Sequence, residues 1–163
     1  MTHFSDEYAP TRAAPRPPLW GLPDPDTQGE FYADVAVKRA VAWIMDTILV
    51  SVLTGLVAIF TVGIGLFFLP VIFLVIGFLY RVITIASKSA TWGMRLASIE
   101  FRTHRGERFT TGLAFVHTLA FYVSMSFVFP QIISVILMMT GARAQGLSDM
   151  VLGTTAINRD ASA

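Results

Sequence analysis

The feature that most constrains this chain is a carboxylate, Asp46, inside a hydrophobic run. Between Ala40 and Phe60 no other charged residue occurs, and Arg39 directly precedes the run. A charged side chain in a membrane helix costs roughly 2.5–3.5 kcal/mol on insertion scales, so such a residue usually has a partner or a function. Arg39 lies seven residues before Asp46. This spacing places both on one helix face, roughly two turns apart.

The composition indicates a bilayer protein. Hydrophobic residues make up 54% of the 163 residues and charged residues 14%, whereas about a quarter of a soluble domain is charged. The length allows one domain. The formal net charge is only +1, so we expect no nucleic-acid partner. The chain has no cysteine, which excludes disulfides, thiolate metal sites and cysteine nucleophiles.

Both ends of the chain are predicted to be tails. Residues 1–30 hold six of the eight prolines, and such a segment cannot bury enough apolar surface to fold alone. We therefore expect a disordered cytoplasmic tail there, a membrane domain over 31–158 and a short tail over 159–163. The first thirty residues contain no apolar h-region, so we expect the first span to be an uncleaved anchor.

Three apolar segments follow the tail, and the first two are each long enough to cross about 30 Å of hydrocarbon. The first pair is joined by a very short uncharged link, which predicts an antiparallel helical hairpin. Pro130 interrupts the third segment, which is therefore either one kinked helix or two short helices. The expected spans are 40–62, 66–86 and 113–139, with a polar loop over 87–112.

Two short pieces of this helical protein have the pattern of strands. Residues 97–103 alternate partly and precede a turn signal, and residues 153–158 are their only evident partner. Of the twelve Lys and Arg residues, four precede the first span and six lie at the end of the second span or in the polar loop that follows it, so ten share one side of the membrane. That side should be cytoplasmic. We expect an all-α membrane protein with a small cytoplasmic cap. A single third crossing would put the C-terminus outside, whereas strand pairing would require it inside.

Four features follow one another along the chain: Arg39 at the start of the first span, Asp46 within it, the segment TWGMRL over residues 91–96 and the segment LSDMVLGT over residues 147–154. In this order they resemble the RDD family of small bacterial membrane proteins, named for one arginine and two aspartates. The segment RAVAWIMD supplies Arg39 and Asp46. The family's T-x-G-x-R-L element corresponds to TWGMRL, with Met94 where lysine is common, and its h-D-x-x-x-G-T element to LSDMVLGT, with Ser148 where histidine is common. The matching residues of these two elements are Thr91, Gly93, Arg95, Leu96, Asp149, Gly153 and Thr154.

The resemblance covers about residues 37–158 and implies a protein of the bacterial inner membrane. For this family, transport of unidentified ligands has been suggested, and cation/proton exchange for some members. The order of the motifs implies that Arg39 and Asp149 belong to one cluster on the cytoplasmic side, which favours an inside C-terminus. Together with Asp46 they are the candidate functional charge cluster.

Asp46 has two interpretations. It is either a protonatable or cation-binding group, or a fixed structural partner that joins helices. Arg81 and His117 are expected at the same membrane level, and His117, Ser124 and Gln131 recur every seven residues, which gives one polar stripe if the helix is continuous. The supporting candidates are Arg81, Arg95, His117 and Gln131.

The sequence contains no phosphate loop, no zinc-protease motif and no nucleophile elbow. We therefore expect no catalysis, no cofactor and no metal site. A three-helix monomer can hardly enclose a polar pathway, so we expect a homo-oligomer or a membrane partner protein. The first hypothesis is a transport-related protein acting on protons, cations or a small solute. The second is a non-transporting accessory or assembly subunit.

Overall fold

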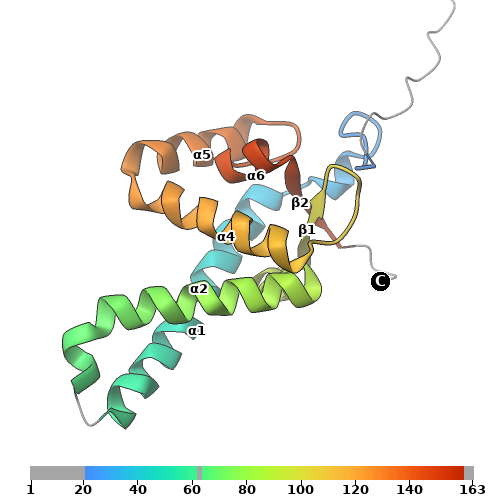
Figure 1. Ribbon diagram of the computed structural model, residues 1–163. Helices are drawn as coiled ribbons and strands as arrows, with labels where there is room; N and C mark the ends of the chain where they lie inside the picture. The colour runs from blue at the N-terminus through green and yellow to red at the C-terminus, as the bar shows by residue number, and fades with distance from the viewer. Residues whose placement is uncertain (1–20, 62–63, 160–163) are drawn as a thin grey trace, which may run out of the picture.

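Two long apolar helices form an antiparallel hairpin. The computed structural model describes residues 21–61 and 64–159. Helix α1 (Val35–Phe60) is connected through a 3-10 helix, η2 (Ile64–Phe68), to helix α2 (Leu69–Lys88) (Figure 1). The helical stretches 29–60 and 64–88 are long enough to cross a membrane, and an 18-residue window within each has a mean hydropathy of 2.1 and 2.5, respectively. The predicted hairpin is thus confirmed.

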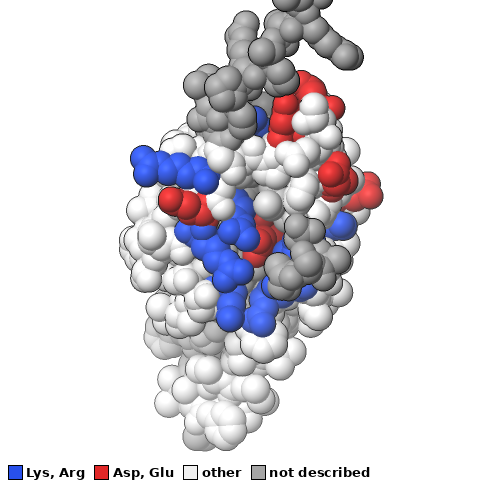
Figure 2. All heavy atoms as spheres, turned by 90° about the vertical axis from the view of Figure 1, so that its right-hand side faces the viewer, with Lys and Arg blue, Asp and Glu red and all other residues white. Residues whose placement is uncertain are grey.

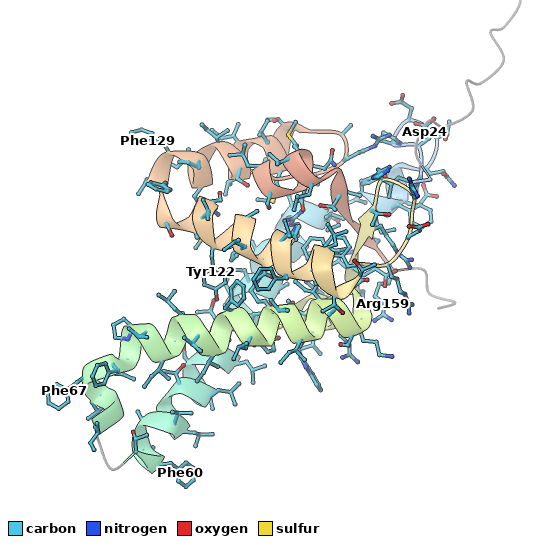
Figure 3. All side chains as sticks on the ribbon, in the orientation of Figure 1. Asp24, Phe60, Phe67, Tyr122, Phe129 and Arg159 are labelled. Carbon is cyan, nitrogen blue, oxygen red and sulfur yellow. The ribbon has the colours of Figure 1, made fainter. Side chains whose placement is uncertain are left out.

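The surface of the hairpin is apolar and its charges gather at one end. Phe60 and Phe67 are 82% and 87% exposed at the hairpin tip, whereas Asp24 and Arg159 lie at the opposite end of the molecule (Figure 3). Lys, Arg, Asp and Glu side chains crowd that opposite end and are absent from the hairpin end of the face in Figure 2. Contiguous exposed apolar surface of this kind suits contact with lipid rather than water.

The third apolar segment folds as two helices, α4 (Thr111–Ser126) and α5 (Val128–Thr140). Their axes differ by 115°, and the break lies at Phe127, three residues before Pro130. A proline ring clashes with the carbonyl four residues earlier, here that of Ser126, so α4 ends at this residue. Pro130 then lies in the first turn of α5, where its missing N–H is tolerated. Of the two expected arrangements, the structure has the pair of short helices.

A small cap closes the charged end of the molecule. Strand β1 (Ile99–Thr103) pairs antiparallel with β2 (Thr154–Asn158), as the sequence predicted. The cap also contains α3 (Trp92–Leu96), between α2 and β1, and α6 (Leu147–Leu152), between α5 and β2. Because β2 pairs with β1, the chain returns to the end of the molecule that holds the polar loop. The α4–α5 pair therefore runs out and back (Figure 1).

The buried core lies where the cap meets the helices. Val35, Ile85 and Ile99 are fully buried, and the ring of Phe101 stacks on that of Phe109 with 5.3 Å between centroids. A turn and the 3-10 helix η1 (Gly29–Phe31) come before α1 along the chain. Of the predicted N-terminal tail, residues 1–20 lie outside the described residues, as do 160–163 of the C-terminal tail.

The strand pairing predicts the sidedness of single cysteines, which the cysteine-free chain makes simple to test. We expect Arg105→Cys and Arg159→Cys to react with a membrane-impermeant maleimide from the same side of the membrane. Phe67→Cys, at the hairpin tip, should react from the other side or not at all. The measurement is labelling of intact spheroplasts and of inverted vesicles. Labelling of Arg159→Cys and Phe67→Cys from one common side would contradict the out-and-back path.

Candidate functional site

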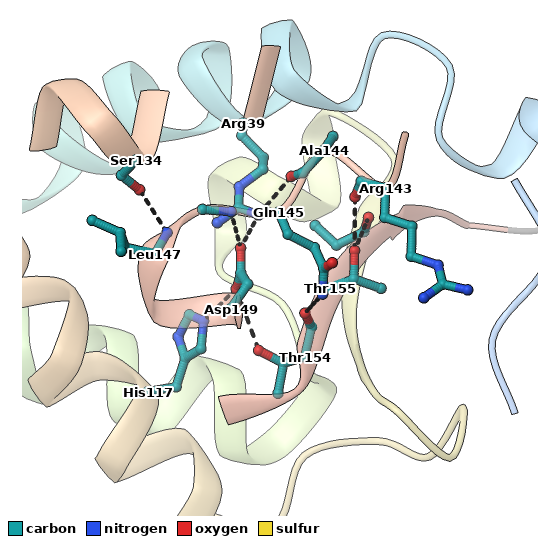
Figure 4. Close-up of polar contacts among 12 residues, drawn as sticks. Arg39, His117, Ser134, Arg143, Ala144, Gln145, Leu147, Asp149, Thr154 and Thr155 are labelled. Carbon is teal, nitrogen blue, oxygen red and sulfur yellow. Dashed lines mark hydrogen bonds and ion pairs between the residues drawn. The ribbon is translucent and has the colours of Figure 1, made fainter. Parts of the chain in front are cut away.

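Asp149 is a fully buried carboxylate on which four elements converge. The Arg39 guanidinium of α1 donates to its Oδ2 at 2.5 Å, and Nε2 of His117, on α4, lies 2.8 Å from Oδ1. The backbone N–H of Gly146 donates to Oδ2 at 3.0 Å and the Thr154 hydroxyl to Oδ1 at 3.3 Å (Figure 4). The carboxylate therefore ties α1, α4, α6 and β2 together.

The local sequence places these groups. Gly146 precedes α6, and Asp149 occupies the third position of the helix, from which a carboxylate reaches back to the cap residue. Gly153 ends α6 with a φ of 62°, a left-handed conformation that glycine adopts without strain. The His117 ring packs against the Phe101 ring, with 4.5 Å between the two ring centroids. Since the carboxylate can only accept, the His117 tautomer that fits has its proton on Nε2.

The surroundings lower the pKa of Asp149. Burial alone would raise it, because a charge is poorly solvated inside the protein. The positive charge of Arg39, the hydrogen bond from His117 and the Gly146 N–H outweigh burial and hold the pKa of this carboxyl well below its usual range. Asp149 is thus a permanent anion at physiological pH. This cluster neutralises its charges internally.

Asp46 forms a second cluster on α1, two turns further along. The Tyr80 hydroxyl of α2 donates to Asp46 Oδ1 at 2.6 Å, and the backbone N–H of Gly93 in α3 donates to the same atom at 2.8 Å. The Tyr80 oxygen in turn accepts the Trp92 N–H at 3.0 Å. The Thr91 side chain caps α3 by accepting the Met94 N–H. Asp46 therefore docks the start of α3 onto the hairpin.

The approach of α3 to α1 requires glycine at position 93. A β-carbon placed there would overlap the carbonyl oxygen of Ala42 and lie 2.8 Å from Asp46 Oδ1. Glycine thus lets a backbone N–H reach a carboxylate buried between helices. This is a physical reason for the glycine of the TWGMRL segment.

Arg81 is the loosely held member of this second cluster. Its Nη1 lies 3.8 Å from Asp46 Oδ2, which is an ion pair but too long for a hydrogen bond. The guanidinium lies over the Phe121 ring, 4.1 Å from its centroid. Its buried Nε has no hydrogen-bond partner among the described residues. A guanidinium has five N–H donors, so this one retains unused donor capacity.

A cavity of about 850 Å³ lies beside both clusters, with Arg39 and His117 of the first and Asp46 and Arg81 of the second on its lining. Its polar lining comes from α1, α2, α4, α5 and α6 and from Tyr32 and Asp34 ahead of α1, and the rest is largely apolar. This volume is within the range of small-ligand pockets, about 300–1,000 Å³. The charged and polar side chains that line it include Arg39, Asp46, Arg81, His117, Gln131 and Ser134.

The structure distributes the predicted site residues differently from their spacing along the chain. Arg39 pairs with Asp149, whereas Asp46 faces Tyr80 and Arg81. Arg39 and Asp46 nonetheless line the same cavity. Arg95 lies apart: it is exposed on α3, with its guanidinium 5.0 Å from the Trp92 ring centroid.

The expected polar stripe of the third segment exists in a different form. The helix break at Phe127 prevents one continuous face. Ser124 and Gln131 still meet across the bend, where the Ser124 hydroxyl donates to Gln131 Oε1 at 3.4 Å. His117 lines the same cavity as both of them.

Sequence reasoning assigned no site role to Tyr80, to the backbone N–H groups of Gly93 and Gly146, or to the Thr154 hydroxyl, although Gly93 and Thr154 are residues of the matched motifs. Tyr80 stands next to Arg81 and could have been found as a polar residue within a span. The Gly93 N–H leaves no signal of its own, because every residue except proline carries one. Among the described residues, no group of three His, Cys, Asp or Glu side chains is arranged to hold a metal ion.

These features define a helical, membrane-type protein with an apolar hairpin and two buried Arg–Asp clusters beneath a polar cap. The model of the RDD family matches residues 34–153, and the chain belongs to this family. No curated protein matches the chain. No solved structure matches it either.

Replacement of Gly93 by alanine should destabilise the protein by about 1–3 kcal/mol, the usual cost of forcing a side chain into a packed site. The added methyl group must displace either the Ala42 carbonyl or Asp46. The check is thermal unfolding of the purified protein in detergent. Gly55→Ala is the matched control, because a β-carbon there has no neighbour within 4 Å. Equal unfolding temperatures for the two variants would contradict the close approach.

The lowered pKa of Asp149 predicts a pH dependence of stability. A carboxyl whose pKa is lower in the folded chain contributes fully above its unfolded value, about 3.9, and loses the contribution as pH falls through the folded value. Stability should therefore decline below about pH 4. Asp149→Asn should cost roughly 3–5 kcal/mol at pH 7, because it leaves Arg39 unpaired, and should flatten the acid limb.

The measurement is the unfolding temperature from pH 3 to pH 8, with Asp26→Asn as an exposed control. An acid limb in Asp149→Asn as steep as that of the parent would show that other carboxyl groups cause the loss.

Proposed function

We propose that this chain is transport-related and moves a small solute or ion through the cavity between its two Arg–Asp clusters. The observation that carries the proposal is the cavity itself, about 850 Å³, with Arg39, Asp46, Arg81 and His117 on its lining. Charged and ionisable side chains beside membrane-spanning helices usually mark a solute or proton pathway. We place the protein in the bacterial inner membrane, with its tail and cap cytoplasmic.

Charge placement supports this orientation. No Lys or Arg occurs over residues 40–80 or 109–142, so the basic residues gather at the cap side, and the side rich in Lys and Arg stays in the cytoplasm. Two spans and one bent pair of helices form the apolar part, which is little material to enclose a route across a bilayer. We therefore propose that the protein works as a homo-oligomer or beside a membrane partner, with the cavity at the contact between chains.

A second candidate function has its own supporting observation. Asp149 is fully paired, and Asp46 Oδ1 already accepts two hydrogen bonds. Satisfied networks of this kind join helices without any need for a passing ligand. On this alternative, the protein is an accessory or assembly subunit and the charges only fix the packing.

Asp46→Asn separates the two functions. The asparagine oxygen can still accept from the Tyr80 hydroxyl and the Gly93 N–H, so the docking of α3 should persist. The negative charge opposite Arg81 is lost. Transport predicts at least a tenfold loss of flux with little change in unfolding temperature, whereas the accessory function predicts lower stability or abundance.

The measurement uses proteoliposomes that contain a pH-sensitive dye and are exposed to sodium, potassium or proton gradients. Glu107→Gln, in the exposed polar loop, is the charge-matched control and should transport like the parent. Equal flux through Asp46→Asn and the parent would refute a pathway past Asp46. No flux through the parent under any gradient would refute ion transport.

A further inference from the structure

We propose that the cavity binds an amphipathic molecule with a single anionic head, a carboxylate or phosphate, held by Arg81, and an alkyl chain directed toward the lipid. This inference names a ligand class for the site of the proposed function and rests on that function for its role in transport. Binding itself can be tested without any flux.

Arg81 is a buried cation with unused hydrogen-bond donors. The guanidinium lines the cavity, its side chain is only 12% exposed, and its Nε is unpartnered among the described residues. Its nearest carboxylate oxygen stands 3.8 Å away. Leaving a buried donor unsatisfied destabilises the protein, because the donor has lost its hydrogen bonds to water. Carboxylates and phosphates both fit a guanidinium by paired hydrogen bonds, so an anionic head is the group that would satisfy it.

The carboxylates of the two clusters have little capacity left for a cationic ligand. Asp149 accepts from Arg39, His117, Gly146 and Thr154, so it has no spare capacity for a cationic ligand. Asp46 Oδ1 is likewise occupied by two donors, and only its Oδ2 faces Arg81.

Gln131 adds a second donor to the same cavity. Its Oε1 accepts from Ser124, which leaves its NH₂ group available. The lining also holds acceptors: the exposed Asp34 carboxylate, Asp46 Oδ2, and His117 Nδ1, which has no partner among the described residues. Arg81 is the buried cation with an unpartnered donor and Gln131 adds a neutral donor, so an anionic head is the group that these two side chains could bind together.

The outer margin of the cavity is apolar and exposed. Charged groups form its buried part, whereas exposed apolar side chains from α1 and α5 complete the wall. Val37 and Trp43 of α1 are 64% and 44% exposed, and Met139 of α5 is 75% exposed. These helices belong to the apolar part of the molecule, so this margin meets lipid. A ligand with a charged head and an apolar chain matches both parts.

The test titrates the purified full-length protein, in neutral maltoside micelles, with dodecyl phosphate and follows its unfolding temperature. Two probes serve as controls: dodecyltrimethylammonium has the same chain with a cationic head, and inorganic phosphate has no chain. We expect a saturable rise in unfolding temperature with dodecyl phosphate alone. Equal stabilisation by the cationic probe, or by inorganic phosphate, would overturn the proposal.

Arg81→Gln should weaken the apparent affinity for dodecyl phosphate about tenfold or more, the usual effect of losing a charge-assisted hydrogen bond. Lys88→Gln is the matched control, because Lys88 is exposed on the same helix, seven residues further along. An equal affinity in Arg81→Gln and the parent would overturn the assignment. If Arg81→Gln does not fold, Gln131→Leu removes the other donor without disturbing the Asp46 pair, and it should also weaken binding.

The source of the head group is resolved by a second arm in lipid nanodiscs. If the occupant is a bilayer phospholipid, phosphatidylglycerol discs should stabilise the parent but not Arg81→Gln relative to phosphatidylcholine discs. If it is a free amphiphile, added dodecyl phosphate should stabilise the parent equally in both discs. No stabilisation in either arm overturns the ligand class. Anion binding without flux would instead refute transport and leave the ligand class in place.

Discussion

The buried Asp149 carboxylate is the interaction on which the arrangement of the cap depends. A lone ion there would be prohibitively costly, and the cost falls only when Arg39, His117 and two further donors surround it. Those donors come from α1, α4, the turn before α6 and β2. The carboxylate can therefore be buried only if the chain returns after α5 to the end of the hairpin that bears Arg39. The out-and-back path of α4 and α5 and the pairing of β2 with β1 meet this requirement.

The two clusters differ in how completely their charges are satisfied, and this difference sets what each can do. Asp149 is saturated and its pKa is held low, so it is suited to a permanent structural role. Asp46 shares one oxygen between Tyr80 and Gly93, and its partner Arg81 retains donors that face the cavity. Arg81 of α2 is thus the side chain that has hydrogen-bond donors left for a ligand. Because the Asp149 cluster is saturated and the Asp46–Arg81 pair is not, a ligand is expected at Arg81.

The hairpin, the two strands and the candidate residues could be predicted because each has a local signature. Hydrophobic length marks the spans, alternation marks β1 and β2, and an isolated charge marks Asp46. The order of the family motifs implied that Arg39 and Asp149 share one cluster, and the structure pairs them; the spacing of Arg39 to Asp46 alone did not predict this partner. Helical periodicity fixes which residues share a face, but it does not say which side chain of another helix is nearest. The break at Phe127 was likewise ambiguous, because Pro130 is compatible with a kink or with a new helix.

The sequence by itself determined that this chain forms apolar helices with buried charges, and its ordered motifs identified the RDD family. The physical reason is that solvation costs and helix periodicity act on neighbouring residues and are legible along the chain. Only the tertiary structure decided that the two carboxylates serve separate clusters and that a backbone N–H from Gly93 holds one of them. It also decided that Arg81 keeps free donors at a cavity. Such partnerships depend on the angle between α4 and α5 and on the approach of α3 to α1, which arise from packing between segments far apart in sequence.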